Sequence, residues 1–525
     1  MAPMLEHRAI NSLTLADVVA IAREGAPVAV PDGVLREVSK GRAIVEHLAE
    51  SPEPAYGIST GFGALAIVSI PPARRRALQS SLIRSHAAST GALMPREVVR
   101  AMMTLRLKTL GSGLTGVRPE VVTTLAAMLN AGITPAVREY GSLGCSGDLA
   151  PLAHVALAAM GEGDVLVEDG VLAVDADSPE SDTQPAADAL TAAGIAPLVY
   201  TEKEGLALIN GTDGMLGMLA LALADLDDLL RLADITAAMT VEALLGTDRV
   251  FAADLAELRP QLGQGASAAN LRKLLAGSPI MASHRHDRVH LVQDAYSLRC
   301  APAVAGAARD TVAHARTVAE RELASTIDNP VVLPDGRVES NGNFHGAPVG
   351  YVLDFLAIAV ADVASMAERR VDKALDRSRN QGLPPFLAHE VGVDSGYMIA
   401  QYAAAGIVAT LKRLAVPASV DSIPSSAMQE DHVSMGWAAA LKLRQGIDGL
   451  RRVLAIELLT AGRALDLRAP LQPAAGTGAA LTALRKAVPG PGPDAFVGEQ
   501  IEDAVALVAS GAVLAAVEQA VGTLA

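Results

Sequence analysis

The residues of this chain with the most unusual chemical potential lie in the run Gly-Ser-Leu-Gly-Cys-Ser-Gly-Asp at 141–148. Within it, Ser146 stands between Cys145 and Gly147. The amide nitrogen of Gly147 can attack the carbonyl carbon of Cys145 and close a five-membered ring, because glycine has no Cβ to crowd the approach. Loss of two water molecules then leaves a methylidene group in place of the Ser146 side chain. Such a ring is an electrophile, which proteins otherwise obtain from a cofactor.

A second interpretation of the same residues stays open at this point. Runs of glycine and serine are typical of loops that serve only the geometry of the chain. The elements and motifs in the remainder of the sequence must therefore decide between an electrophile and an ordinary loop.

The composition is apolar, with half of the 525 residues hydrophobic, 19% charged and a mean hydropathy of +0.31. A membrane-spanning helix needs about 20 consecutive apolar residues. The longest uncharged run, 54–73, is broken by Gly57, Gly61, Gly63 and the pair Pro71–Pro72. We therefore expect no membrane span, and apolar helices packed into a multi-subunit core.

The net charge of −15 argues against nucleic acid or an anionic membrane as a partner, because both attract basic surfaces. The N-terminal residues lack the charged and apolar regions of a signal peptide. The two cysteines are too few for a disulfide framework. These features predict a cytoplasmic location.

Helix signals dominate the chain. Thr14 is a candidate N-cap with Asp17 three residues later, and Gly25 ends that helix. Pro95 and Pro119 stand at expected helix starts. Directly after the Cys-Ser-Gly triplet, a helix is expected from about 148 to 160.

A different pattern occupies 163–199. Residues 165–174 predict a hairpin around the turn Asp169–Gly170, and 178–185 predicts an exposed loop. We take this region as a boundary between a mixed N-terminal lobe, 1–200, and a second part, 201–525.

The second part is dominated by long helices, which in soluble proteins pack as bundles. They are expected at 214–246, where Thr212 is a candidate N-cap, and at 346–378, 395–417 and 434–464. A proline- and glycine-rich loop at 489–493 precedes a final helical pair. The predicted fold class is mainly α: a long-helix bundle core with a smaller mixed N-terminal lobe.

Several motifs follow one another along nearly the whole chain: Tyr56–Gly63, Ser85–Ala88, Gly141–His154, Glu202–Thr212, Val292–Cys300, Gly342–His345, Ser419–Pro424 and Gln429–His432. Together they resemble the histidine ammonia-lyase family, relatives of the phenylalanine and tyrosine ammonia-lyases. The common triplet of that family is Ala-Ser-Gly, whereas this chain has cysteine at 145. Its side chain stays outside the ring, so we expect the change to be tolerated, with the thiol as a small buried group.

The resemblance implies an ammonia-lyase-like fold and a 4-methylidene-imidazol-5-one group (MIO) formed from Cys145, Ser146 and Gly147, with no metal and no nucleotide. It implies conversion of L-histidine to trans-urocanate and ammonia, a step of histidine catabolism. It also implies a homotetramer in which several subunits share each active site. Free amides at the helix starts near Asp148 and Thr212 are expected to stabilise charge on the ring.

Catalytic and carboxylate-binding roles follow from the same resemblance. Tyr56 is expected to accept the β-proton, for which its phenol must be shifted from a pKa of about 10. The Arg299 guanidinium can bind both oxygens of a substrate carboxylate. A structural salt bridge is an equally good explanation for this arginine. Asn210 and Tyr296 resemble residues that orient the ring and the amine.

Specificity is expected to depend on His86 and Glu430. Glu430 can accept an imidazole N–H or act as a base, and His86 can supply the complementary contact. Gln293 and Phe344 resemble neighbours of the substrate. The structural alternatives are a buried histidine, a helix-capping glutamate and a core phenylalanine.

Other functions remain open on the sequence alone. A tyrosine ammonia-lyase or an aromatic 2,3-aminomutase would use the same group, and either the amine or the imidazole of the substrate could attack it. A helical scaffold that never cyclises is a non-enzymatic alternative. The histidines at 284, 286 and 290 lack a standard zinc spacing, so no metal site is expected.

Overall fold

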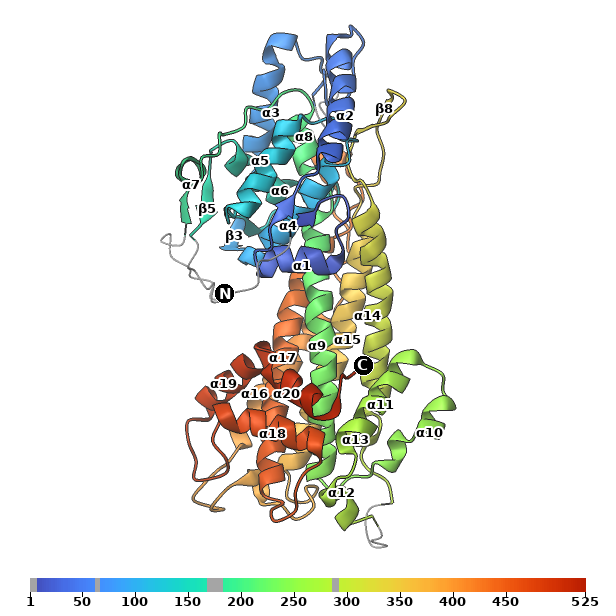
Figure 1. The fold of residues 1–525 in the computed structure, drawn as a ribbon, viewed down its shortest axis with the longest axis vertical. Coiled ribbons are helices and arrows are strands. Elements are labelled where there is room, and N and C mark those ends of the chain that lie inside the picture. Colours follow the sequence, from blue (N-terminus) through green and yellow to red (C-terminus); the bar gives the residue numbers. More distant parts are fainter. Residues whose placement is uncertain (1–6, 62–66, 168–182, 286–291) are drawn as a thin grey trace. The chain divides into compact units, whose positions relative to one another are not determined.

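The computed structural model describes residues 7–61, 67–167, 183–285 and 292–525. These residues form mainly α-helices, α1 to α20, with short strands β1 to β8 (Figure 1). By their internal contacts they divide into two compact units, each built from several segments. The first unit comprises 1–221, 316–353 and 417–441, and the second comprises 222–315, 354–416 and 442–525.

The first unit holds eight complete helices among the described residues: α1 (Leu15–Arg23), α2 (Asp32–Glu50), α3 (Pro72–His86), α4 (Arg96–Leu110), α5 (Pro119–Asn130), α6 (Leu149–Ala159), α7 (Ala186–Ala192) and α8 (Glu204–Ile209). Its strands form two-stranded sheets: β1 (Arg8–Ala9) with β2 (Val28–Ala29) in parallel, and the antiparallel pairs β3 (Thr90–Leu93) with β4 (Arg138–Tyr140), β5 (Asp164–Leu166) with β6 (Thr183–Pro185), and β7 (Val331–Val332) with β8 (Val338–Glu339). This unit has the mixed helix and strand content that the sequence predicts for the N-terminal lobe.

Local sequence signals explain where these helices begin and end. Thr14 and Asp17 form a reciprocal capping box at the start of α1, as predicted, and Gly25 follows its end with φ +70°. Pro119 is the first residue of α5, whereas Pro95 is the N-cap residue just before α4. The helix predicted after the triplet is α6, most of whose residues are buried.

The helices of the first unit pack around α6 and α4 (Figure 1). Helix α6 contacts α3, α5 and α8, and α4 contacts α1 and α5. Because α6 is apolar on all sides, it is stable only when neighbours cover it. This packing sets the loop before α6, which carries the triplet, on a rigid base.

The hairpin prediction needs a correction. β5 pairs with β6, so its partner is Thr183–Pro185, within the segment predicted as a loop. The predicted turn Asp169–Gly170 and the rest of 168–182 lie outside the described residues. Local turn signals favoured a nearby partner, whereas the observed pairing spans a longer connection.

Four long helices contribute residues to both units: α9 (Asp213–Ala243), α14 (Ala301–Ala324), α15 (Ala347–Leu375) and α17 (Gly436–Asp466). The remaining helices of the second unit are α10 (Ala253–Glu257), α11 (Leu262–Leu275), α12 (Pro279–Ser283), α13 (Tyr296–Arg299), α16 (Met398–Leu414), α18 (Ala475–Ala487), α19 (Val497–Ala509) and α20 (Ala512–Val521). The predicted long helices are confirmed, each within a few residues of its predicted ends.

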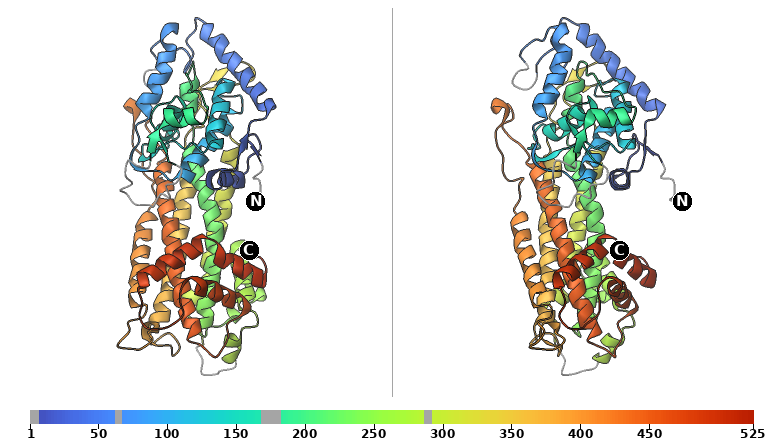
Figure 2. Two further views of the ribbon diagram at one scale, coloured as in Figure 1. Left: turned by 60° about the vertical axis from the view of Figure 1, so that its left-hand side comes forward. Right: turned by 90° about the vertical axis from the view of Figure 1, so that its left-hand side faces the viewer.

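In the second unit the long helices run side by side as a bundle (Figures 1 and 2). Some polar side chains buried in it have several partners. Glu457 accepts hydrogen bonds from Thr236 and Thr240 and is paired with Arg370. A buried carboxylate without such donors would cost several kcal/mol.

Helix α15 is long and apolar enough, by length and composition, to cross a membrane. In this structure 61% of its most apolar window is buried inside the protein. Core helices of bundles have the same length and composition, so this helix alone is weak evidence for a membrane span.

Candidate functional site

The loop that carries Ser146 connects β4 to α6 and is fastened by its own side chains. Ser142 Oγ accepts the amide of Gly144 at 3.1 Å and donates to Asp148 Oδ1 at 2.8 Å. Ser142 is therefore hydrogen-bonded to the residue just before the Cys-Ser-Gly triplet and to the residue just after it.

Two segments from much later in the chain clasp the same loop. The carbonyl of Leu143 accepts the amide of Met435 at 2.9 Å. The carbonyl of Gly144 accepts the amide of Gly346 at 3.1 Å and the hydroxyl of Ser434 at 2.8 Å. These three hydrogen-bond donors fix the backbone immediately before the triplet.

Gly147 occupies a position that only glycine can fill. Its φ is +78°, and a Cβ added there would lie 2.1 Å from the carbonyl oxygen of Gly211. The two glycines form a parallel bridge, and the amide of Asp148 donates to Gly211 at 2.7 Å. Among the described residues, the Gly147 amide itself makes no hydrogen bond. It is therefore available as the nucleophile for ring closure.

Asp148 links the loop to the start of α9. Its Oδ2 accepts the amides of Gly214 and Met215 at 2.9 and 3.0 Å. Burial raises the pKa of Asp148 to about 7. Two of the amides that were expected to be free near Thr212, those of Gly214 and Met215, are therefore bonded to Asp148. The Thr212 hydroxyl does not cap α9, because it donates to Glu322 Oε1 at 2.6 Å.

Glu430 meets the triplet directly. Its Oε1 accepts the hydroxyl of Ser146 at 2.7 Å, and its Oε2 accepts the thiol of Cys145 at 3.2 Å and the hydroxyl of Ser425 at 2.8 Å. Cys145 is buried and Glu430 half-buried. The structure therefore joins two of the predicted site segments, more than 280 residues apart, by side-chain contact.

The donors around Glu430 outweigh its burial. Burial alone would raise its pKa, but the hydrogen bonds from Ser146, Ser425 and Cys145 and the nearby His86 bring the pKa below its ordinary value. The carboxylate is therefore ionised near neutral pH. Burial, followed by the Glu430 charge, raises the pKa of the Cys145 thiol to about 12, so it stays protonated.

His86 is the last residue of α3. Its Nδ1 lies 2.9 Å from the carbonyl of Leu82 and 3.1 Å from the hydroxyl of Ser85. Since a carbonyl can only accept, Nδ1 carries the proton and Nε2 of the neutral ring is an acceptor. Burial lowers the pKa of His86, against the opposing effect of the Glu430 charge, and this keeps the ring neutral.

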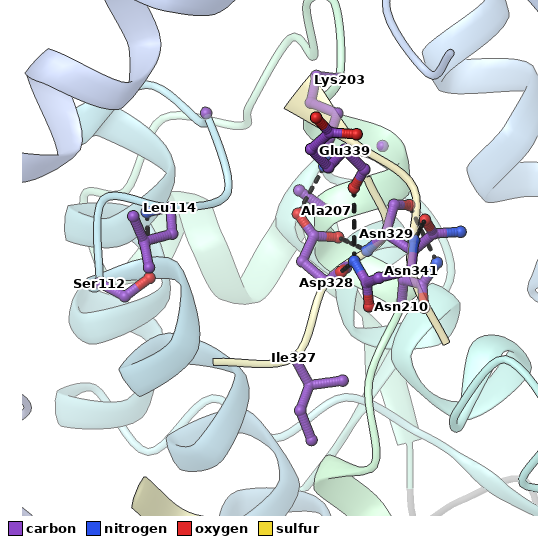
Figure 3. Close-up of polar contacts among 12 residues, drawn as sticks. Ser112, Leu114, Lys203, Ala207, Asn210, Ile327, Asp328, Asn329, Glu339 and Asn341 are labelled. Atoms are coloured by element: carbon purple, nitrogen blue, oxygen red, sulfur yellow. Dashed lines mark hydrogen bonds and ion pairs between the residues drawn. The ribbon is translucent and has the colours of Figure 1, made fainter. Parts of the chain in front are cut away.

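Asn210 precedes Gly211, the backbone neighbour of Gly147. Its Nδ2 donates to the carbonyl of Asn329 at 3.2 Å (Figure 3). Its own carbonyl accepts Arg106 Nη1 at 2.9 Å. Its buried Oδ1 has no partner among the described residues. A buried acceptor left free in this way marks a place where a further donor fits.

A polar network around Asn210 includes Lys203, Asp328, Asn329 and Asn341 (Figure 3). Lys203 Nζ and Asp328 Oδ2 form a fully buried ion pair at 2.5 Å. Asn341 donates its amide to Asn329 Oδ1 at 3.0 Å and its Nδ2 to the Asp328 carbonyl at 2.9 Å. Asn329 thereby connects Asn210 to the segment that carries Phe344.

Phe344 is half-buried and lies in the first unit. The next residue, His345, stacks on His432 with ring centroids 5.3 Å apart, and their Nε2 and Nδ1 atoms are 3.2 Å apart. His432 follows Glu430 by two residues. This pair of rings brings the Phe344 segment beside the Glu430 segment.

Tyr56 is half-buried on a segment that the structure packs tightly. Residues 57–61 are buried, and Ile58 belongs to a small core with Val45 and Val332. Residues 62–66, which follow, lie outside the described residues. Packing fixes the backbone on which Tyr56 is presented.

Gln293, Tyr296 and Arg299 belong to the second unit. Gln293 is exposed, and Tyr296 is 69% exposed at the start of α13. The Arg299 guanidinium lies 4.7 Å over the Tyr296 ring. Arg299 Nε is buried and has no hydrogen-bond partner among the described residues, so the predicted structural salt bridge does not occupy this nitrogen.

Of the histidines at 284, 286 and 290, the structure describes only His284. Both ring nitrogens of His284 lie near carbonyl oxygens, of Ile280 at 3.0 Å and of Gly246 at 2.8 Å. The histidines at 286 and 290 lie outside the described residues. The expectation of no metal stays a prediction.

Sequence reasoning missed the residues that hold the predicted ones in place. Ser425, Asn341 and Arg106 had no motif of their own, and Asp148 stood out only as a helix start. An aspartate directly after the Cys-Ser-Gly triplet, at a helix N-terminus, is the one signal that pointed to a positioning role.

Known proteins resemble this chain over most of its length. A sequence profile of the aromatic amino acid lyases matches residues 13–486. A histidine ammonia-lyase of Streptomyces avermitilis is 60% identical over 516 residues, which is 98% of each chain. One of Streptomyces coelicolor is 60% identical over 515 residues, again 98% of each chain.

Solved structures share the fold. A tyrosine aminomutase of Streptomyces globisporus superposes with a TM-score of 0.92 at 35% identity, covering 99% of this chain and 100% of its own. A histidine ammonia-lyase of Trypanosoma cruzi superposes with a TM-score of 0.88 at 35% identity, covering 98% and 96%. The chain therefore belongs to the aromatic amino acid lyase family.

Proposed function

We propose that this protein is a carbon–nitrogen lyase that removes ammonia from L-histidine and releases trans-urocanate. The observation that carries the proposal is the 2.7 Å hydrogen bond between Ser146 and Glu430, which sets an ionised carboxylate beside the triplet. Such a carboxylate accepts an imidazole N–H, whereas a phenyl ring would leave it unpaired. The identity to the Streptomyces histidine ammonia-lyases supports the same substrate.

The residues around the triplet fit a methylidene-imidazolone formed from Cys145, Ser146 and Gly147. Within the described part of the chain the Gly147 amide makes no hydrogen bond, and Gly211 leaves no room for a Cβ at 147. The free Oδ1 of Asn210 lies on the residue next to Gly211. When formed, the group supplies an electron sink that makes the substrate amine a better leaving group.

Recognition of the imidazole ring is assigned to two acceptors. Glu430 presents an ionised carboxylate, and His86 presents Nε2 because Nδ1 donates to Leu82. An N–H donor on the substrate ring can be satisfied by either group. Phe344 is assigned to pack near the bound ring, and Gln293 to contact the substrate as a polar neighbour.

The substrate carboxylate is assigned to Arg299. Its position over the Tyr296 ring restrains the guanidinium, and its buried Nε is free of hydrogen bonds among the described residues. A carboxylate would satisfy that nitrogen with a charge-assisted hydrogen bond. Tyr296 is assigned to orient the amine, and Tyr56 to accept the β-proton.

We also propose a homotetramer in which each active site uses residues of more than one subunit. Tyr296 carries a large aromatic ring yet is 69% exposed in one chain, as expected for a residue that a second copy covers. Both cysteines are free, which suits a reducing compartment, so we place the enzyme in the cytoplasm.

The test is urocanate formation followed by its ultraviolet absorbance, together with the intact mass of the chain. Wild-type protein is expected to be lighter than its sequence by two waters and to form urocanate. Ser146→Ala is expected to keep the fold and the full mass and to lose nearly all turnover. Ser39→Ala, which removes an exposed hydroxyl from α2, is the control. Equal turnover in Ser146→Ala would overturn the proposal.

A tyrosine ammonia-lyase or an aromatic 2,3-aminomutase is the second candidate, because a tyrosine aminomutase shares the fold with a TM-score of 0.92. Incubation with L-histidine, L-tyrosine and L-phenylalanine separates the reactions. Cinnamate-type or β-amino acid products without urocanate would support the second candidate.

A further inference from the structure

The carboxylate of Glu430 divides its hydrogen bonds unevenly between its two oxygens. Oε2 accepts two donors, the Cys145 thiol at 3.2 Å and the Ser425 hydroxyl at 2.8 Å. Oε1 accepts one, the Ser146 hydroxyl at 2.7 Å. The two donors on Oε2 lie on different segments, so together they fix both the position and the rotation of the carboxylate.

The three donors have different fates. Ring formation removes the Ser146 hydroxyl as water, so its hydrogen bond to Oε1 ends. The Cys145 side chain stays outside the ring, and Ser425 takes no part in the condensation. Both donors to Oε2 therefore survive, while Oε1 is left unoccupied on the side of the triplet.

We propose that Cys145 and Ser425 are positioning residues that hold Glu430 through Oε2, so that Oε1 is free to receive a proton or an imidazole N–H of the substrate. The inference rests on the proposed function. It assigns a purpose to Cys145, for which the sequence suggested only a small buried group.

The backbone of the Glu430 segment is shaped for this contact. The amide of Ser425 donates to the carbonyl of Glu430 at 2.8 Å, and the amide of Glu430 donates back at 3.3 Å. Ser426, Ala427 and Met428 between them have φ values of +50°, +53° and +69°. Three consecutive left-handed residues without a glycine are unfavourable, and they return the Ser425 side chain to Glu430.

The titratable groups that act on Glu430 belong to two other segments. They are His86 at the end of α3 and Cys145 in the triplet loop. The Cys145 thiol has a pKa raised to about 12, chiefly by burial, so it remains a donor throughout the physiological range. His86 is neutral there, which leaves the hydrogen-bond donors as the main support for the ionised carboxylate.

The experiment compares Ser425→Ala and Cys145→Ala with wild type. Cys145→Ala restores the triplet common in the family, so its intact mass is expected to remain lighter by two waters. Ser422→Ala is the matched control, because it removes a hydroxyl that accepts the amide of Val433 in the same segment and does not touch Glu430. Cys145→Ser, which keeps a donor, is the conservative variant.

Two measurements report the protonation of the Glu430 carboxylate. Infrared difference spectra against pH, assigned by their loss in Glu430→Gln, report its protonation without turnover. The acid side of the kcat/KM profile reports the same group in the reaction. Loss of a donor disfavours the ionised form, so both are expected to move to higher pH. At a fixed pH on the acid side, kcat/KM is expected to fall about tenfold in Ser425→Ala and about threefold in Cys145→Ala, because a thiol is the weaker donor.

The outcomes separate this inference from the proposed function. If wild type forms urocanate but Ser425→Ala and Cys145→Ala titrate like wild type, the positioning role is overturned and the function stands. An equal shift in Ser422→Ala would also overturn it, because general loosening of the segment would then explain the effect. If wild type neither loses two waters nor forms urocanate, the proposed function is overturned. The infrared titration then still tests whether Cys145 and Ser425 hold Glu430 through Oε2.

Discussion

At the scale of single residues, Glu430 is the group that the site controls most closely. Half-burial works against its charge, yet donors from Ser146, Ser425 and Cys145 keep its pKa below the ordinary value. A hydrogen bond to a charged group is worth about 1.5–3 kcal/mol, which is enough to outweigh partial desolvation. The chain therefore holds an ionised and oriented carboxylate beside the triplet before the ring forms.

Replacing Glu430 with glutamine tests that carboxylate. Glu430→Gln keeps the size but removes the charge and one acceptor, so turnover is expected to fall by about 10²–10⁴-fold. In wild type, activity is lost as pH falls through the pKa of Glu430, because protonation removes the acceptor. That acid-side loss should vanish from the residual activity of Glu430→Gln. The exposed Glu53→Gln is the control, and wild-type turnover in Glu430→Gln would contradict the role.

Sequence motifs located the reactive residues at this scale better than the residues that hold them. Ser146 and Glu430 were both singled out, and the structure joins them at 2.7 Å. The supporting Ser425 and Asn341 were not, because a hydroxyl or an amide carries no pattern that reveals its partner. Their function comes from contacts made only after folding.

At the scale of elements, the loop before α6 and the turn at Gly211 form one unit of backbone. Gly147 and Gly211 approach so closely that a side chain at either position would collide with its neighbours. The loop is thus held by the hydrogen bonds of the Ser142 side chain and by the hydrogen bond from the Asp148 amide to Gly211. Holding the loop in one conformation favours ring closure, because the Gly147 nitrogen must meet the Cys145 carbonyl carbon in a defined geometry.

Gly147→Ala should prevent ring formation. The added Cβ would lie 2.1 Å from the Gly211 carbonyl oxygen at a φ of +78°, so the loop must shift. We expect a chain of unmodified mass and no urocanate. Gly265→Ala is the control, because a Cβ there meets nothing within 4 Å. A Gly147→Ala chain lighter by two waters would refute the geometry.

Elements defined by local signals were the ones that sequence could predict. The Thr14–Asp17 capping box and the long periodic helices are encoded within a few turns of chain, and the structure has them. The strand pairing of β5 depends on a partner beyond 168–182, and no local turn signal specifies it. The packing that fixes residues 57–61 is equally non-local.

At the scale of the whole molecule, each compact unit is assembled from distant parts of the chain. Residues 316–353 and 417–441 belong with 1–221, so Phe344 and Glu430 share a unit with the triplet. A single boundary near residue 200, as composition suggests, stays a prediction. Composition changes along the chain cannot show that later segments return to an earlier unit.

The proposed sharing of sites between subunits can be tested by mixing. Ser146→Ala and Arg299→Ala should each be inactive alone, because one lacks the ring and the other the carboxylate partner. Co-expressed, they should recover activity, with about a quarter of the sites intact if subunits assemble at random. Assays of purified mixed assemblies measure this directly. No recovery would mean that Ser146 and Arg299 must act from the same chain.

The clasp of residues 346 and 434–435 on the loop at 143–144 has a consequence for biosynthesis. Ser434 lies 290 positions after Gly144, so a nascent polypeptide cannot complete these contacts until most of it has left the ribosome. The contacts that hold the triplet loop are therefore completed only late in synthesis or after it. Loss of two waters from a chain would therefore indicate that segments far apart in its sequence had come into contact.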